Sequence, residues 1–99
     1  MNDLLRIHRR WDIELALAGH DVPLIRAHRD ATDDEKRDAV RSWEAAMVEA
    51  LTAYATRTAE SGKVWDRRGD AAKVAECTAT ARAAVADART LTGYLRGQR

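Results

Sequence analysis

Hydrophobic positions in the last third of the chain recur at spacings of three and four, which places their side chains on one face of a helix. These positions are Val74, Cys77, Ala81, Ala84, Ala88, Leu91 and Leu95. A stripe with a seven-residue repeat is typical of a helix that packs along another helix. Because alanine dominates the stripe, the neighbouring backbone has to come close. We therefore expect a helix over about residues 70–95, capped by Asp70 and packed on a second helix.

The middle of the chain carries a second helical stripe, built from larger side chains. Its members are Val40, Trp43, Met47, Ala50 and Tyr54, flanked by Val48 and Leu51. Thr32 and Glu35 have the spacing of a capping box at a helix start. Asp33 and Asp34 suit the positive end of the helix dipole. Ser61-Gly62 indicates a stop, so the sequence predicts a helix over about residues 33–60.

A shorter amphipathic helix is expected over about residues 3–18. Its apolar stripe consists of Leu4, Ile7, Trp11, Leu15 and Ala18. Gly19 follows directly, as is common just past a helix C-terminus. Pro23 then lies near the start of a short helical segment that we expect over about residues 22–29, because proline is favoured in the first turn of a helix.

These elements predict an all-α fold, an antiparallel three- to four-helix bundle. Its largest part is a long helical hairpin formed by residues 33–60 and 70–95. The connector between these two helices is short, so they should pack as antiparallel neighbours. The N-terminal helix and the segment 22–29 then fold back along the hairpin. The 99 residues form one domain, with residues 96–99 as a frayed tail.

Composition limits the size of the core and the range of partners. The chain has 20 alanines but only 17 leucine, isoleucine and valine residues, so a monomer buries little apolar area. We therefore expect a homodimer or another protein as partner. The net charge of +1 gives no steering toward nucleic acid or a membrane. The excess of arginine over lysine, 14 to 3, suggests a GC-rich bacterial or phage genome.

Cysteine content and hydropathy bear on location. A lone cysteine, Cys77, excludes an internal disulfide and fits a reducing compartment. The sequence has neither a recognisable signal peptide nor an apolar stretch of roughly 20 residues, the length that spans a bilayer. We expect a cytoplasmic protein that does not enter a membrane.

Two surfaces are candidates for binding a partner protein. The first is the connector 63–69 with Val64, Trp65, Arg67 and Arg68, because tryptophan and arginine are enriched where partners bind tightly. Alternatively, Val64 and Trp65 plug the end of the bundle and the arginines are solvated. The second surface consists of Ala79, Ala83 and Ala86 on the outer face of the last helix. These alanines either serve as strong helix formers or let another helix pack closely.

Arginines at positions 82, 89 and 96 share one face of the last helix. If the hairpin is centred near Trp65, Arg82 lies near Glu49 and Arg96 lies near Asp33 and Asp34. Arg89 then lies near Glu44 or Arg41. Such exposed pairs help to set the register of two helices although each contributes little energy. A ladder that binds phosphates or an acidic partner is the alternative.

A degenerate helix-turn-helix around residues 12–29 would make the chain a small DNA-binding regulator. Gly19 would form the turn, and Arg26, His28 and Arg29 would reach the nucleic acid. Leu15 is large at a position where such motifs favour a small residue, and nearby aspartates dilute the positive charge. DNA binding is therefore the alternative and not the main expectation.

Catalytic and metal-binding patterns are absent from the sequence. No His-x-x-x-His or Glu-x-x-His pair occurs, and Cys77 lies on the packing stripe among alanines. We expect no enzyme activity, no metal and no cofactor. The expected function is non-enzymatic protein–protein interaction, in the manner of an adaptor or regulator that self-associates.

Overall fold

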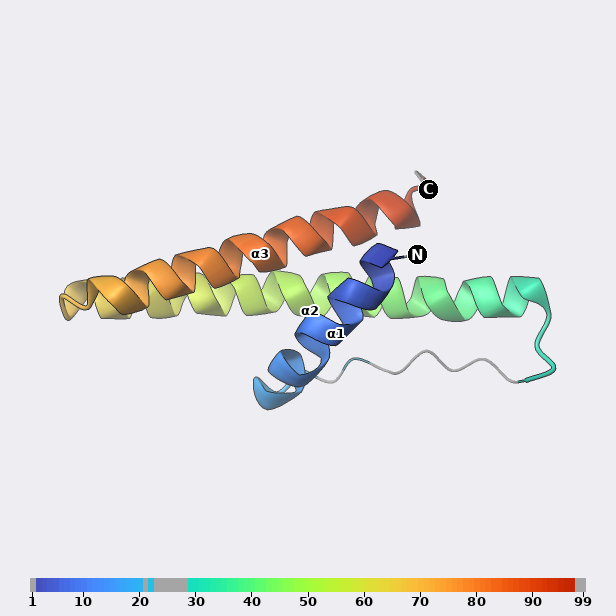
Figure 1. Cartoon of the computed structure of the whole chain (residues 1–99), viewed down its shortest axis with the longest axis horizontal. Coiled ribbons are helices and arrows are strands. Elements are labelled where there is room, and N and C mark those ends of the chain that lie inside the picture. Colours follow the sequence, from blue (N-terminus) through green and yellow to red (C-terminus); the bar gives the residue numbers. More distant parts are fainter. Residues whose placement is uncertain (1, 21, 23–28, 98–99) are drawn as a thin grey trace.

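Three helices account for most of the chain. The computed structural model describes residues 2–20, 22 and 29–97. Over these residues the helices are α1 (Asn2–Leu17), α2 (Asp33–Arg67) and α3 (Ala71–Leu95). The two long helices form an antiparallel hairpin, and α1 crosses one face of it obliquely (Figure 1). The expected all-α hairpin fold is confirmed. The predicted segment 22–29, apart from Val22 and Arg29, lies outside the described residues, as do residues 98 and 99.

The start of α2 follows the predicted cap. Thr32 has an extended backbone, and its Oγ1 accepts a hydrogen bond of 3.2 Å from the backbone N–H of Glu35. Asp33 and Asp34 follow at the positive end of the helix. The side chain of Thr32 thus satisfies one of the backbone donors that a helix start leaves open.

The predicted end of α2 at Ser61-Gly62 is wrong, because the helix continues without a break to Arg67. Gly62 lies on the contact with α3. A Cβ placed on Gly62 would lie 3.3 Å from the Cβ of Cys77. The glycine therefore lets two backbones approach and does not end the helix. The turn is much shorter than the predicted connector 63–69, which puts Val64, Trp65 and Arg67 in the last turns of α2.

The hairpin turn uses a glycine and an aspartate. Gly69 has a φ of +75°, in the left-handed region that glycine adopts without a steric cost. The side chain of Asp70 then accepts a hydrogen bond of 3.1 Å from the backbone N–H of Lys73. Asp70 is therefore the N-cap of α3, as the sequence predicts.

The longer α2 also changes which residues face each other across the hairpin. The turn lies at Gly69 and not near Trp65, so the predicted register is wrong. Arg82 lies along a groove with Thr56 and Ala59 instead of near Glu49. At the other end, Nη2 of Arg41 donates a hydrogen bond of 2.7 Å to the carbonyl of Leu95. Arg82, Arg89 and Arg96 are all exposed.

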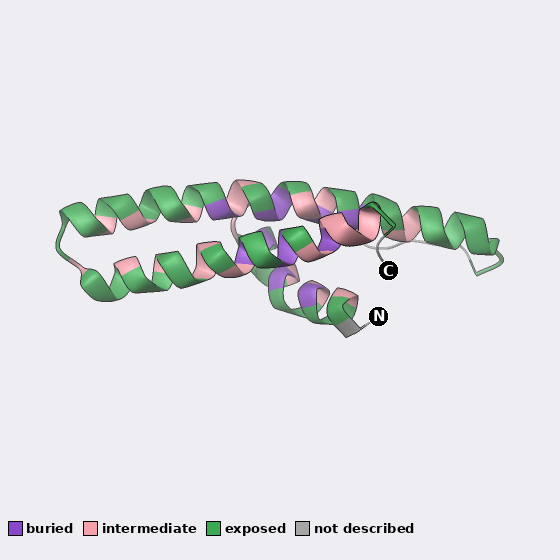
Figure 2. Cartoon of the chain, turned by 90° about the horizontal axis from the view of Figure 1, so that it is seen from above, coloured by how far each residue is buried: buried purple, intermediate pink, exposed green. Residues whose placement is uncertain are grey.

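The hydrophobic core lies where α1 crosses the hairpin. The predicted stripes supply all of it except Ala55 of α2: Ile7, Trp11 and Leu15 from α1; Trp43, Met47, Ala50 and Leu51 from α2; Ala84, Ala88 and Leu91 from α3. Figure 2 shows these buried positions gathered along the middle of the hairpin, next to α1. The alanines at 84 and 88 are buried, which confirms the close helix contact that the small residues predict.

The hairpin beyond α1 contains no buried residue. Residues 56–83, all of which the structure describes, are exposed or half-buried. This part includes the turn and the last three turns of α2, and we call it the hairpin tip. In the hairpin tip two helices contact each other without a third. The first turns of α2, residues 33–42, also contain no buried residue. We call residues 43–55 and 84–91 the packed half of the hairpin, and the hairpin tip its open half.

Candidate functional site

The open half begins where α1 ends. Nη1 of Arg57 donates a hydrogen bond of 3.4 Å to the carbonyl of Ala18, which ties the end of α1 to α2. Gly19, with a φ of +85°, follows the end of α1, and the chain then packs back on the hairpin, with the ring of His20 edge-on to Tyr54 and Val22 against the core. Within the described ranges 2–20, 22 and 29–97, no third helix continues toward the turn, while α2 and α3 run together to Gly69.

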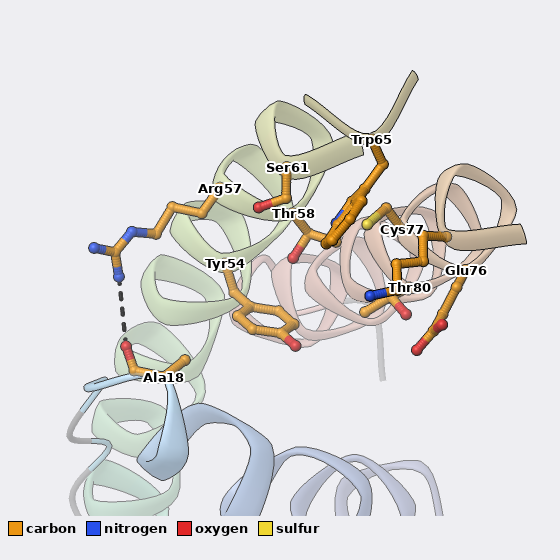
Figure 3. Close-up of a pocket in the computed structure, with 10 residues that line it drawn as sticks. Ala18, Tyr54, Arg57, Thr58, Ser61, Trp65, Glu76, Cys77 and Thr80 are labelled. Atoms are coloured by element: carbon orange, nitrogen blue, oxygen red, sulfur yellow. Dashed lines mark hydrogen bonds between the residues drawn. The ribbon is translucent and has the colours of Figure 1, made fainter. Parts of the chain in front are cut away.

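Past Ala18, a groove of about 560 Å³ runs between α2 and α3, and we call it the tip groove. Its lining residues are Ala18, Tyr54, Arg57, Thr58, Ser61, Trp65, Lys73, Glu76, Cys77 and Thr80. Figure 3 shows Trp65 of α2 and Cys77 of α3 meeting between the two helices, while Arg57 extends toward the carbonyl of Ala18. Two aromatic side chains, small hydroxyl side chains and a thiol provide the surface, and three charged side chains lie at its rim.

Trp65 is the largest side chain of the tip groove, and it is half-buried. Nζ of Lys73 lies 3.9 Å from the centroid of the indole, and Cζ of Arg68 lies 5.3 Å from it. These are cation–π contacts, which hold the indole in one orientation. Figure 3 shows the ring beside Cys77 of α3. Trp65 thus packs against the hairpin in part and also forms a wall of the groove.

The remaining residues of the predicted Trp/Arg surface are accessible. Val64 is 38% exposed, and Arg67 and Arg68 are exposed at the end of α2. Arg57 and Lys73 line the tip groove from α2 and α3, with Glu76 as the acidic member. The tip groove therefore combines an aromatic wall with a rim in which basic side chains outnumber acidic ones.

The alanine surface is only partly as predicted. Ala79 and Ala86 are exposed on α3, but Ala83 is half-buried and packs against the core. Its assignment to the outer face is wrong, because α1 approaches α3 on that side. A second groove, of about 610 Å³, lies where Ala86 and Val85 meet Ala55 of α2, with Arg82 and Arg89 along it.

The residues of the DNA-binding alternative are only partly described. Arg26 and His28 lie outside the described residues. Arg29 is exposed in the turn that precedes α2. The supposed first helix of the motif is part of α1, whose Trp11 and Leu15 are buried against the hairpin.

A buried carboxylate on α3 is a feature that sequence reasoning missed. Asp87 is 6% exposed, and its Oδ2 accepts a hydrogen bond of 2.7 Å from Nε1 of Trp11. Its Oδ1 accepts one of 2.9 Å from Nη2 of Arg6. The bond to Asp87 raises the pKa of the Arg6 guanidinium. The only indication of this contact in the sequence is that Asp87, an acidic residue, lies between the stripe positions Ala84 and Ala88.

Among the described residues, no three histidine, cysteine, aspartate or glutamate side chains lie together as a metal site. Cys77 is half-buried at the tip groove. None of the helices in the described part of the chain is long and apolar enough to cross a membrane.

Comparison of the chain with known protein families, with curated proteins and with solved structures found no match.

Proposed function

We propose that this protein is a non-enzymatic binding module, of the kind used as an adaptor or regulator, whose tip groove accepts one helix of a partner protein. The observation that supports this most is the lack of any buried residue in positions 56–83, next to a groove with two aromatic side chains. Helix pairs gain most of their stability from burying an apolar face against further elements. A partner helix would supply this burial in the hairpin tip.

A helix is the shape that fits the site. Over the packed half, α1 already lies on the hairpin as a third helix, and the tip groove begins at the end of α1. A partner helix in this place would extend the three-helix packing toward the turn. Thr58, Ser61 and Thr80 are small, so a helix backbone can approach closely between them.

The rim indicates the chemistry of the partner. Arg57 and Lys73 lie on opposite walls, and Arg68 lies above Trp65. We therefore expect a partner helix with an apolar stripe for Trp65 and Tyr54, flanked by carboxylates for the basic side chains. Tryptophan, tyrosine and arginine are the residues that most often dominate the energy of such interfaces.

A photo-crosslinking experiment tests this proposal. Benzoylphenylalanine placed at Glu76, an exposed position at the rim of the tip groove, should form a covalent adduct with one partner in the native host, identified by mass spectrometry. The crosslinked peptide of the partner should have an apolar stripe flanked by acidic residues. Trp65→Ala in the same protein should remove the adduct while circular dichroism shows that the helices are retained.

A matched probe at Glu35, an exposed position at the far end of α2, should not capture the same partner. The proposal is contradicted if adducts form equally at Glu35 and Glu76, or if Trp65→Ala leaves capture at Glu76 unchanged. It is also contradicted if the captured segment is basic or lacks an apolar stripe.

A further inference from the structure

The outward face of α1 exposes three large apolar side chains in a row. Leu5 is 52% exposed, Ile13 is 69% exposed and Leu17 is 84% exposed. With Arg9 between the first two, they follow a spacing of four residues, which forms one continuous ridge on a helix. We call this row the α1 ridge. The opposite face of α1 carries the buried core residues, so the α1 ridge points away from the hairpin.

Charges beside the α1 ridge are ordered along the helix. The first half carries Asp3 and three arginines, Arg6, Arg9 and Arg10, and is basic overall, while the second half carries Asp12 and Glu14. Arg6 already binds Asp87, so the remaining positive charge comes from Arg9 on the ridge and from Arg10 beside it, whose Cζ lies 4.7 Å from the centroid of the Trp11 indole. A surface with positive charge at one end and negative charge at the other is complementary to its own copy turned end to end.

We propose that the α1 ridge is the contact surface for a second copy of this chain, with the two α1 helices antiparallel about a two-fold axis. In this arrangement Leu5 of each copy lies near Leu17 of the other, and Arg9 lies near Ile13. Each basic half then faces an acidic half. A parallel arrangement would place arginines opposite arginines. A two-fold contact uses the same patch on both copies, as most homodimers do.

The position of α1 makes this contact accessible. Figure 2 shows α1 on the outside of the hairpin, where a second copy can reach the α1 ridge without displacing α2 or α3. The tip groove lies between α2 and α3 beyond Ala18, so it stays open in the dimer. The dimer is thus independent of the proposed function and would present two tip grooves.

The contact area sets the expected strength of the dimer. A helix of 16 residues is about 24 Å long and about 10 Å wide. One helix–helix contact of this length buries less than the roughly 1,200 Å² of a standard stable interface. We therefore expect a weak dimer that forms at high micromolar protein concentration and dissociates on dilution.

Sedimentation velocity of the full chain tests the proposal, over concentrations from about 1 μM to about 1 mM, a range that covers weak interfaces. The expected result is a monomer–dimer equilibrium that weakens with added salt. Arg10→Glu alone and Glu14→Arg alone should each weaken dimerisation by about tenfold, the scale of one close charge pair. The double variant should restore it, because residue 10 of each copy lies close to residue 14 of the other and this pair again joins opposite charges.

Glu60→Arg, an exposed substitution in the hairpin tip, serves as the control and should leave the dimer unchanged. A monomer over the whole concentration range would overturn the proposal, as would single charge reversals without effect. The proposal is also overturned if the protein stays monomeric and binds vesicles of anionic phospholipid, and Ile13→Ser abolishes this binding. The α1 ridge would then be a membrane-binding surface.

Discussion

Nε1 of Trp11 lies 2.7 Å from Oδ2 of Asp87, and this hydrogen bond joins the first helix to the last. Arg6, less than two turns before Trp11, donates to the other carboxylate oxygen of Asp87. Oη of Tyr94 also donates a hydrogen bond of 2.9 Å to Asp3 near the start of α1. A buried tryptophan alone could slide over an alanine-rich surface. These polar contacts fix the position of α1 along the hairpin, and so determine where the tip groove begins.

Asp87→Ala should loosen α1 from the hairpin. The substitution leaves the buried indole N–H of Trp11 and the Arg6 guanidinium without their acceptor. Hydrogen bonds to a charged group typically contribute about 1.5–3 kcal/mol, so we expect a loss of that size in the free energy of unfolding. Urea denaturation followed by tryptophan fluorescence measures it.

Asp38→Ala is the control for this prediction, because Asp38 is exposed and its replacement should change stability by no more than about 0.5 kcal/mol. Equal stability of the Asp87 and Asp38 variants would show that the carboxylate does not hold α1.

Ala84→Leu should overpack the contact between α2 and α3. Ala84 is fully buried, so the added atoms have no space, and such insertions typically cost about 1–3 kcal/mol. Ala79→Leu adds the same atoms on the exposed face of α3 and should be nearly neutral. Thermal unfolding of the two variants compares them directly. If both melt at the wild-type temperature, position 84 does not face the helix contact.

Hydrogen exchange should divide the hairpin into two parts. Amides over residues 43–55 and 84–91 lie in the packed half and should exchange slowly, whereas residues 56–83 should exchange faster because they lack buried neighbours. Mass spectrometry of peptides from the free protein measures this. Uniform protection along α2 and α3 would mean that the hairpin tip does not need a partner for its stability.

The helical stripes could be predicted from sequence because they depend on local spacing. Ile7, Trp11 and Leu15 repeat at four-residue intervals, and all three are buried as expected. The caps at Thr32 and Asp70 could also be predicted from the sequence, because each side chain contacts a backbone N–H only three residues away. These features need no knowledge of the rest of the fold.

The end of α2 and the hydrogen bonds of Asp87 depend on distant parts of the chain. The sequence therefore predicted the wrong end for α2 and gave no prediction for the contacts of Asp87. Glycine after serine is a common helix stop, but Gly62 is required by its contact with Cys77 on α3. That contact is visible only once the hairpin is formed. Asp87 is 76 residues from Trp11, and one carboxylate on an alanine-rich helix gives no indication of such a donor.

The register of the hairpin decides whether the tip groove exists, because Trp65 and Cys77 share a groove only if α2 runs unbroken past Gly62. The chain offers a direct test through its single cysteine, Cys77. In Gly62→Cys, the new Cβ lies about 3.3 Å from the Cβ of Cys77, which is close enough for the two thiols to form a disulfide. Ala53→Cys serves as the comparison, since residue 53 would face Cys77 if the hairpin turned near Trp65.

Mild oxidation of dilute protein, followed by intact mass measurement and peptide mapping, reads out the bond. The structure predicts rapid formation of a disulfide within one chain in Gly62→Cys and none in Ala53→Cys. A disulfide in Ala53→Cys, or only disulfides between chains in Gly62→Cys, would contradict the hairpin register and the tip groove with it.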